Sequence, residues 1–258
     1  VKNLILFGSI IILYLGYGLI PLLIYFIIIS FLGLLYALIL VRNIHSDFKI
    51  RFDVRIIPKY IIISVPLVFA GAAEFVNLKI DNVLISFLID ETHSGYYSAS
   101  FNIFMAICLI PLAITKVYFP NFIKQFHENK FGAFKFLNNI RNYFVIYCCF
   151  FGLILYYLSE FIIINLYSES FLDSVIVLRF LSFALIPIIL NRLYNYTLIA
   201  LKQNKYYFKI TAFGSLINIS LNILLIPEIG ILGAVVATIL TELFILVGSY
   251  IKIRKLNI

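Results

Sequence analysis

The stretch IPLLIYFIIISFLGLLYALILV, from Ile20 to Val41, contains no charged residue and is long enough to cross a bilayer. A transmembrane helix needs about 20 consecutive, mainly apolar residues, and similar runs recur along the whole chain. The strands of a transmembrane β-barrel are shorter, at about 10 residues, and alternate in polarity. The sequence therefore predicts an all-α integral membrane protein.

The overall composition agrees with this prediction. Hydrophobic residues make up 63% and charged residues 12% of the 258 positions, against about 45–50% and about 25% in soluble domains. The net charge of +8 comes from Lys and Arg beside the membrane ends, so we expect no nucleic-acid partner. The three cysteines lie in apolar runs without ligand spacing, and we predict no disulfide, no metal and no cofactor.

The apolar runs predict about eight transmembrane helices, the first of them short. Their approximate limits are residues 4–18, 20–41, 58–89, 96–118, 140–158, 175–201, 208–226 and 231–251. The third is too long for one ordinary span, because about 32 residues rise roughly 48 Å against a hydrocarbon core of about 30 Å. It must tilt, break or protrude. Pro187 predicts a kink in the sixth.

Lys and Arg collect in alternate loops. The basic segments hold Arg42, Lys49, Arg51, Arg55 and Lys59; Lys124, Lys130, Lys135 and Arg141; Lys202, Lys205 and Lys209; and Lys252, Arg254 and Lys255. The loops between them hold Asp90, Glu91, Glu160, Glu169, Asp173 and Glu228 and no Lys or Arg. Because cytoplasmic loops are the ones enriched in Lys and Arg, we expect both termini to be cytoplasmic.

Polar groups interrupt the third predicted span, within AAEFVNLKIDNVL. Glu74, Asn77 and Asp81 follow i, i+3, i+7 spacing and share one helix face, and Lys79 lies to one side. A charge at the centre of a membrane helix costs about 2.5–3.5 kcal/mol, so such residues are candidates for function. The alternative is that Lys79, Asp81 and Asn82 reach the outer headgroups, where a charge costs little.

Later spans carry similar groups. These are Arg179, Asn191, Arg192 and Asn195 in the sixth; Thr211, Ser215, Asn218 and Asn222 in the seventh; and Thr238, Thr241 and Glu242 in the eighth. For Ser and Thr, hydrogen bonds between helices are the simpler reading, and Gly233 with Ala237 predicts close helix packing. Arg179 has a simpler reading too, as an anchor at the outer interface.

Polar faces on several spans predict a hydrophilic central cavity. The cations would suit a phosphate-bearing substrate, because a fixed positive charge in a low dielectric holds an anion strongly. The carboxylates would balance the cations or carry a coupling proton or sodium ion. These features predict a transporter, with no catalytic residue.

Several stretches resemble the Wzx-type polysaccharide flippases of the MATE-like MOP transporter superfamily. They include SVPLVFAGAAEFVNLKIDNVLISFLIDETHSGYYSAS from Ser64, FPNFIKQF from Phe119 and LYSESFLDSVIVLRFLS from Leu166. The resemblance runs from about Pro58 to Lys255 and is strongest in G-x-x-G-A-x-x-A-T-x-x-x-E, which ends at Glu242. Members of that superfamily usually have twelve or more helices in two six-helix lobes.

The resemblance implies an organisation. Residues 1–57 would be two helices and a basic cytoplasmic loop that end the N-terminal lobe, and residues 58–258 the six-helix C-terminal lobe. The eight spans would be the fifth to the twelfth, with the first four helices absent. The chain would then be a truncated product, a fragment of a longer reading frame, or one of two cooperating polypeptides. Its expected partners are the missing lobe, other polysaccharide-assembly proteins and the lipid bilayer.

The implied function is to flip an undecaprenyl-pyrophosphate-linked oligosaccharide across the bacterial cytoplasmic (inner) membrane, for O-antigen of lipopolysaccharide or for capsule. From depth and charge, the predicted substrate-binding residues are Lys79, Arg179, Arg192, Asn77 and Asn218. The predicted residues for charge balance or ion coupling are Glu74, Asp81 and Glu242. The alternatives are a MATE-type small-molecule exporter and an inactive remnant. A multi-span glycosyltransferase or polymerase is less favoured, because the longest outward loop has only about 15 residues.

Overall fold

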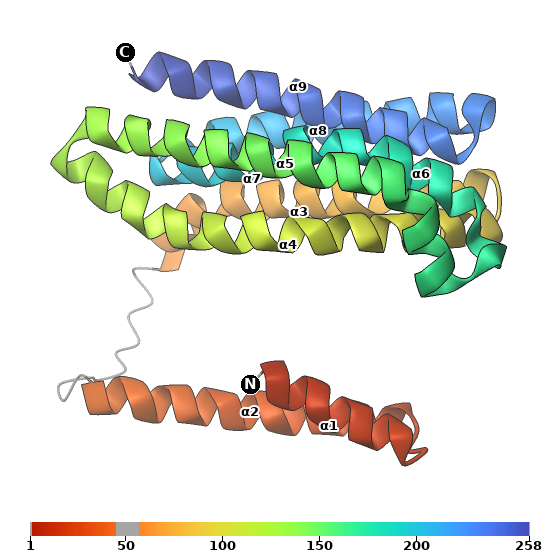
Figure 1. Ribbon diagram of the computed structural model, residues 1–258. Helices are drawn as coiled ribbons and strands as arrows, with labels where there is room; N and C mark the ends of the chain where they lie inside the picture. Colours follow the sequence, from red (N-terminus) through yellow and green to blue (C-terminus); the bar gives the residue numbers. More distant parts are fainter. Residues whose placement is uncertain (1, 45–56, 258) are drawn as a thin grey trace. The chain divides into compact units, whose positions relative to one another are not determined.

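The computed structural model describes residues 2–44 and 57–257, and every regular element in these ranges is helical (Figure 1). Contacts divide the chain into two compact units, Val1–Ile57 and Pro58–Ile258, here called unit 1 and unit 2. The assignment of the two units to lobes of a flippase stays a prediction.

Unit 1 is a pair of helices joined by a short turn. Helix α1 spans Lys2–Tyr14 and α2 spans Leu19–Ile44, and the two pack on each other. Gly16 in the turn has φ of +76°, a backbone conformation that residues with a Cβ rarely adopt. Glycine at this position therefore allows the chain to reverse direction between α1 and α2. The predicted basic residues Lys49, Arg51 and Arg55 lie outside the described residues.

Within residues 2–44 and 57–257, seven helical segments are long and apolar enough to cross a membrane. They are Leu19–Ile44, Tyr60–Leu88, Glu91–Glu128, Lys130–Tyr167, Asp173–Ala200, Asn204–Ile229 and Ile231–Leu256. These correspond to the second to eighth predicted spans and confirm the all-α membrane fold. The first predicted span is α1, whose 13 residues rise only about 20 Å, less than the thickness of a hydrocarbon core.

Unit 2 contains the remaining helices. They are α3 (Ile57–Leu88), α4 (Glu91–Glu128), α5 (Lys130–Tyr167), η2 (Glu169–Phe171), α6 (Asp173–Leu181), η3 (Ser182–Ala184), α7 (Leu185–Ala200), α8 (Asn204–Ile229) and α9 (Ile231–Asn257). The long helices lie side by side along one direction (Figure 1). The third predicted span is one continuous helix, α3, with Pro66 inside it.

Helices α4 and α5 are much longer than predicted, at 38 residues each. The segment expected as a basic loop is helical except at Asn129, whose side chain accepts the N–H of Gly132 at 3.0 Å. Charged residues in this segment obscured a helical pattern whose apolar members, Phe122, Phe134 and Leu137, are buried. The outward loop expected from Ser159 is also mostly helical, because α5 continues to Tyr167.

The sixth predicted span is interrupted, as proline suggested, but one turn before the proline. Between α6 and α7 the chain forms the short 3₁₀ helix η3, and Pro187 is the third residue of α7. Proline has no N–H to donate, and its ring crowds the carbonyl four residues earlier, here that of Phe183 in η3. The interruption therefore falls at the residues whose hydrogen bonds the proline removes.

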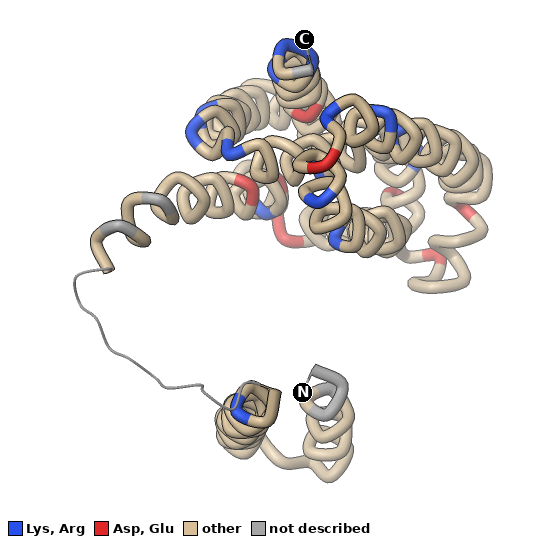
Figure 2. The backbone as a smooth tube through the Cα atoms, turned by 90° about the vertical axis from the view of Figure 1, so that its left-hand side faces the viewer, with Lys and Arg blue, Asp and Glu red and all other residues tan. Residues whose placement is uncertain are grey.

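The charged ends of unit 2 differ. The α4–α5 turn, the α7–α8 turn and the end of α9 lie at one end of the unit (Figure 1), and Lys and Arg gather there (Figure 2). The α3–α4, α5–α6 and α8–α9 connections lie at the other end (Figure 1), and the acidic residues of the predicted outward loops lie in or beside them. This arrangement is the one that alternating loop charges predict. We call the first of these the basic end.

Helices α8 and α9 approach closely at Gly233. A Cβ at this position would lie 2.5 Å from the backbone carbonyl carbon and oxygen of Leu225, so the sequence prediction of close packing is correct here. Gly233→Ala is expected to lower the free energy of unfolding by about 1–3 kcal/mol, because backbone atoms must shift. Thermal unfolding in detergent measures this effect.

The matched control is Gly71→Ala in α3, where nothing lies within 4 Å of the added Cβ. Alanine is a better helix former than glycine, so this control is expected to be neutral or stabilising by up to about 1 kcal/mol. Equal melting temperatures for the two variants would contradict the close-approach explanation.

Candidate functional site

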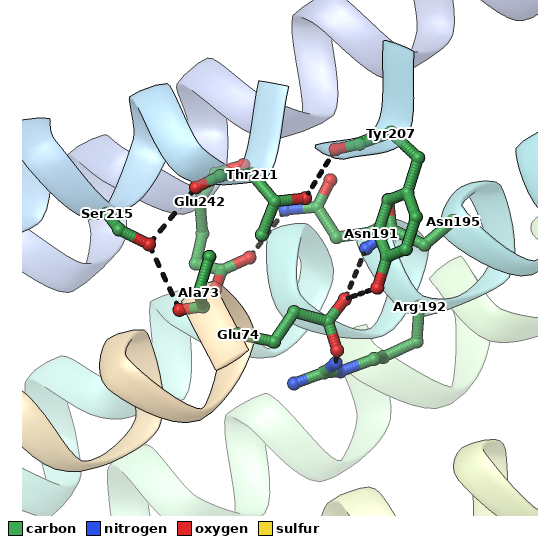
Figure 3. Close-up of polar contacts among 9 residues, drawn as sticks. All are labelled: Ala73, Glu74, Asn191, Arg192, Asn195, Tyr207, Thr211, Ser215 and Glu242. Carbon is green, nitrogen blue, oxygen red and sulfur yellow. Dashed lines mark hydrogen bonds and ion pairs between the residues drawn. The ribbon is translucent and has the colours of Figure 1, made fainter. Parts of the chain in front are cut away.

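A carboxylate and a guanidinium meet inside unit 2. Glu74 on α3 forms an ion pair with Arg192 on α7 (Figure 3), and each side chain is 20% exposed. The other oxygen of the Glu74 carboxylate accepts from Asn195 Nδ2 at 2.9 Å and from the Tyr207 hydroxyl at 2.7 Å. Three helices, α3, α7 and α8, therefore converge on one carboxylate.

The pair leaves most of the Arg192 guanidinium available. Only Nη1 donates to Glu74, while Nε and Nη2 have no hydrogen-bond partner among the described residues. A guanidinium has five N–H donors in a planar fork that fits phosphate oxygens. Arg192 is thus held in place by one bond and can offer several donors to an anion.

A second carboxylate lies next to this cluster. Glu242 Oε2 on α9 accepts from Asn191 Nδ2 at 2.5 Å, and the same amide nitrogen lies 2.8 Å from the Glu242 carbonyl oxygen (Figure 3). Ser215 on α8 donates to the Ala73 carbonyl at 3.0 Å, which ties α8 to α3. These bonds join the predicted polar faces of α3, α7, α8 and α9.

Asp81 forms a separate cluster. Its side chain is 2% exposed and accepts from Tyr97 at 2.6 Å, Thr238 at 2.5 Å and Asn222 at 2.8 Å. These donors come from α4, α9 and α8, and all of them are neutral. Asp81 therefore lies inside the helix bundle with no cation as a hydrogen-bond partner among the described residues. This burial does not fit the alternative of a residue at the headgroups.

Unpartnered oxygens mark the same region. The amide oxygens Oδ1 of Asn77, Asn218 and Asn222 are buried with no hydrogen-bond partner in the part of the chain that the structure describes. Asn222 Nδ2 donates to Asp81 and also to the Asn218 carbonyl at 2.9 Å. Buried oxygens are nearly always hydrogen-bonded, so such orphans need a partner such as water or an ion.

Two predicted substrate-binding residues lie apart from these clusters. Lys79 is exposed on α3 and makes no hydrogen bond or ion pair with any described residue. Arg179 lies on α6, where its Nε donates to Ser159 at 2.8 Å and its Nη2 is 3.5 Å from Glu160. Its 39% exposed side chain lies near the end opposite the basic end. The structure does not bring Arg179 together with Arg192.

Two tyrosines were missing from the sequence prediction. Tyr207 lies one turn before the polar series that begins at Thr211, so extending that series backward would have found it. Tyr97 belongs to the Gly-Tyr-Tyr-Ser motif that marked the resemblance, but its contact with Asp81 depends on how α3 and α4 pair. No pattern within one helix predicts that contact.

The membrane-length helices define a multi-pass membrane protein, and the charged groups held between them are of the kind that membrane proteins retain in ion or substrate pathways. Residues 2–257 match the sequence profile of the family described as lipid II flippase MurJ. The chain belongs to this family. The match confirms a flippase family of the MOP superfamily, and the Wzx branch stays a prediction.

Two relatives were found among curated proteins. The capsular polysaccharide biosynthesis protein CapF of Staphylococcus aureus is 23% identical over 76% of this chain and 50% of its own length. An uncharacterized membrane protein of Methanocaldococcus jannaschii is 26% identical over 83% of this chain and 48% of its own length. The chain thus spans about half the length of these relatives. No solved structure matches it significantly.

Proposed function

We propose that this protein moves an undecaprenyl-pyrophosphate-linked glycan from the cytoplasmic to the outer leaflet of a bacterial cytoplasmic membrane. The family, described as lipid II flippases, supports a lipid-linked substrate. The relative named for capsular polysaccharide biosynthesis supports an oligosaccharide for a surface polysaccharide, such as capsule or O-antigen. The basic end of unit 2 faces the cytoplasm, in keeping with the distribution of Lys and Arg.

The observation that carries this proposal is that the Arg192 guanidinium is held in place but still has donors available. Its guanidinium lies among membrane-length helices, is oriented by Glu74, and keeps its Nε and Nη2 donors unpartnered among the described residues. Charge-assisted hydrogen bonds to phosphate are strong, and stronger still where water is scarce. Arg192 contacts the pyrophosphate of the substrate, while the lipid tail remains in the bilayer.

Asp81 serves a different purpose from Glu74. Glu74 is already neutralised by Arg192, whereas Asp81 has only neutral donors. Asn222 is one of those donors, and its Oδ1 atom, like that of Asn218 one turn earlier on α8, is buried without a partner among the described residues. A carboxylate with nearby free oxygens suits a coupling sodium ion or proton. Of the three predicted carboxylates, we therefore assign ion coupling to Asp81.

A flipping assay tests the proposal. The purified chain is placed in liposomes that carry a fluorescent undecaprenyl-pyrophosphate-linked sugar in both leaflets, and a membrane-impermeant quencher is added. Active protein is expected to make all of the probe quenchable, whereas protein-free liposomes lose only the outer-leaflet share. Cysteines placed at Lys205 and Glu91 should label from opposite sides of the membrane. Quenching no greater than in protein-free liposomes, or transport of cationic dyes alone, would contradict the proposed function.

A further inference from the structure

A small pocket lies between α5, α7 and α9 at the basic end of unit 2. It encloses about 200 Å³, and its polar lining residues are Asn138, Arg141, Tyr194, Tyr250 and Arg254. Each of the three helices contributes at least one of these side chains. The pocket is separate from the Glu74–Arg192 cluster, and nothing in the proposed transport step uses it.

The charge in this pocket is not balanced. Arg141 donates from Nε and Nη2 to the Asn142 side chain, at 3.2 and 3.0 Å. Arg254 makes no hydrogen bond or ion pair with any residue that the structure describes. No Asp or Glu that the structure describes lines the pocket. Two guanidinium groups without a carboxylate attract an anion, and their planar forks favour phosphate.

The other side of the pocket is apolar. Phe134, Leu137 and Ile253 line it, and each is less than 5% exposed. The Tyr194 and Tyr250 rings lie beside each other with centroids 6.1 Å apart. Tyrosine is enriched where membrane meets water, because its ring is apolar and its hydroxyl polar. A site with an apolar floor and a cationic rim matches a lipid headgroup better than a fully hydrated ion.

We propose that this pocket binds the phosphate of an anionic phospholipid in the leaflet at the basic end. Basic pockets between transmembrane helices on the cytoplasmic side are typical sites for such headgroups. The bound lipid is a resident ligand and not the transported substrate. Tyr194 lies two residues after Arg192, hence about 200° around α7, so a headgroup against Tyr194 braces α7 on the face opposite the Glu74 pair.

Lipid binding to the purified full chain tests this inference without any transport assay. The probes are short-chain phosphatidylglycerol, phosphatidylcholine with the same chains, and inorganic phosphate, each added to protein in a neutral detergent. Phosphatidylglycerol alone is expected to raise Tm with concentration, because a ligand of the native state stabilises it. Removing both charges with R141Q and R254Q should weaken its apparent affinity by about 10- to 30-fold.

The matched control removes two exposed charges at the same end that do not line the pocket, with K209Q and K255Q. Its affinity is expected to change by less than about threefold, since neither side chain lines the pocket and exposed charges are partly screened by salt. Comparing Tm without lipid first separates loss of binding from loss of stability. Equal weakening in the two double variants would overturn the pocket. Equal protection by phosphatidylcholine or by inorganic phosphate would overturn the anionic-lipid assignment.

Discussion

Arg192→Gln is expected to reduce the rate of flipping by about 30-fold or more while the protein still inserts into the membrane. The substitution has two effects. It removes the donors offered to pyrophosphate, which lowers the rate of flipping, and it leaves Glu74 unpaired, which lowers the stability of the protein. Truncating one partner of a hydrogen-bonded charge pair in a desolvated site costs about 2–5 kcal/mol, and about 1.4 kcal/mol corresponds to a tenfold change in rate. The liposome quenching assay measures the rate.

A double variant separates the two effects. Arg192→Gln with Glu74→Gln removes both charges of the pair, so the stability lost by the single variant should largely return. Flipping should not return, because phosphate still lacks its cation. Recovery of transport in the double variant would reduce Arg192 to a structural role. Lys209→Gln, which removes an exposed charge from α8, is the control for net charge.

Lys79→Gln gives a useful comparison with Arg192→Gln. Both residues were predicted to bind substrate, but Lys79 is exposed and makes no contact with a charged partner among the described residues. Its substitution therefore leaves no carboxylate unpaired. Any loss of flipping in Lys79→Gln must therefore reflect a lost contact of Lys79 with the substrate or with a surface outside unit 2.

Asp81→Asn is expected to reduce ion-driven flipping by about tenfold or more with little change in stability. Asparagine has nearly the same shape, and the hydroxyls of Tyr97 and Thr238 can rotate to suit an amide. The substitution removes the negative charge that would hold a coupling ion. Flipping rates measured with and without an imposed sodium or proton gradient should become equal in the variant.

Two further variants test whether the effect of Asp81→Asn comes from ion coupling or from lost stability. Asp81→Ala leaves the hydroxyls of Tyr97 and Thr238 without an acceptor, at a cost of about 1–3 kcal/mol for a buried unsatisfied group, so it should also lower Tm. Asp90→Asn is the matched control, since Asp90 caps α4 by accepting the N–H of His93 at 2.8 Å and asparagine caps equally well. A gradient dependence that survives in Asp81→Asn would exclude Asp81 as the coupling residue.

Much of the fold could be predicted because the bilayer constrains it so strongly. The lengths of the apolar runs predicted the spans from Leu19 onward. The charges of the loops predicted that successive loops lie at opposite ends of the helices. The errors fall where helices continue past the apolar run. Around Asn129 and beyond Leu158, charged residues were interpreted as loops, although the chain there remains helical and buries one face against its neighbours. Hydropathy identifies the residues that contact lipid, but it does not show where a helix continues beyond the hydrocarbon core.

The site was predictable only within single helices. The shared face of Glu74 and Asp81 follows from helical spacing, and both side chains accept hydrogen bonds from other helices in the structure. Their partners could not be deduced, because the contacts of Glu74 with Arg192 and Tyr207 join positions more than 100 residues apart. Such pairing depends on the relative height and rotation of neighbouring helices, and these cannot be read from the residue pattern of a single sequence.

The 3₁₀ segment η3 divides the span from Asp173 to Ala200 into two short rods. Helix α6 is hydrogen-bonded to α5 through Arg179 and Ser159. Helix α7 is bonded instead to α3 through Arg192 and to α9 through Asn191. A mid-helix 3₁₀ stretch is a natural hinge. Both halves of this membrane crossing pack on α4, α5 and α9, but their polar side chains bond to different helices, so a bend at η3 would move Arg192 relative to Arg179.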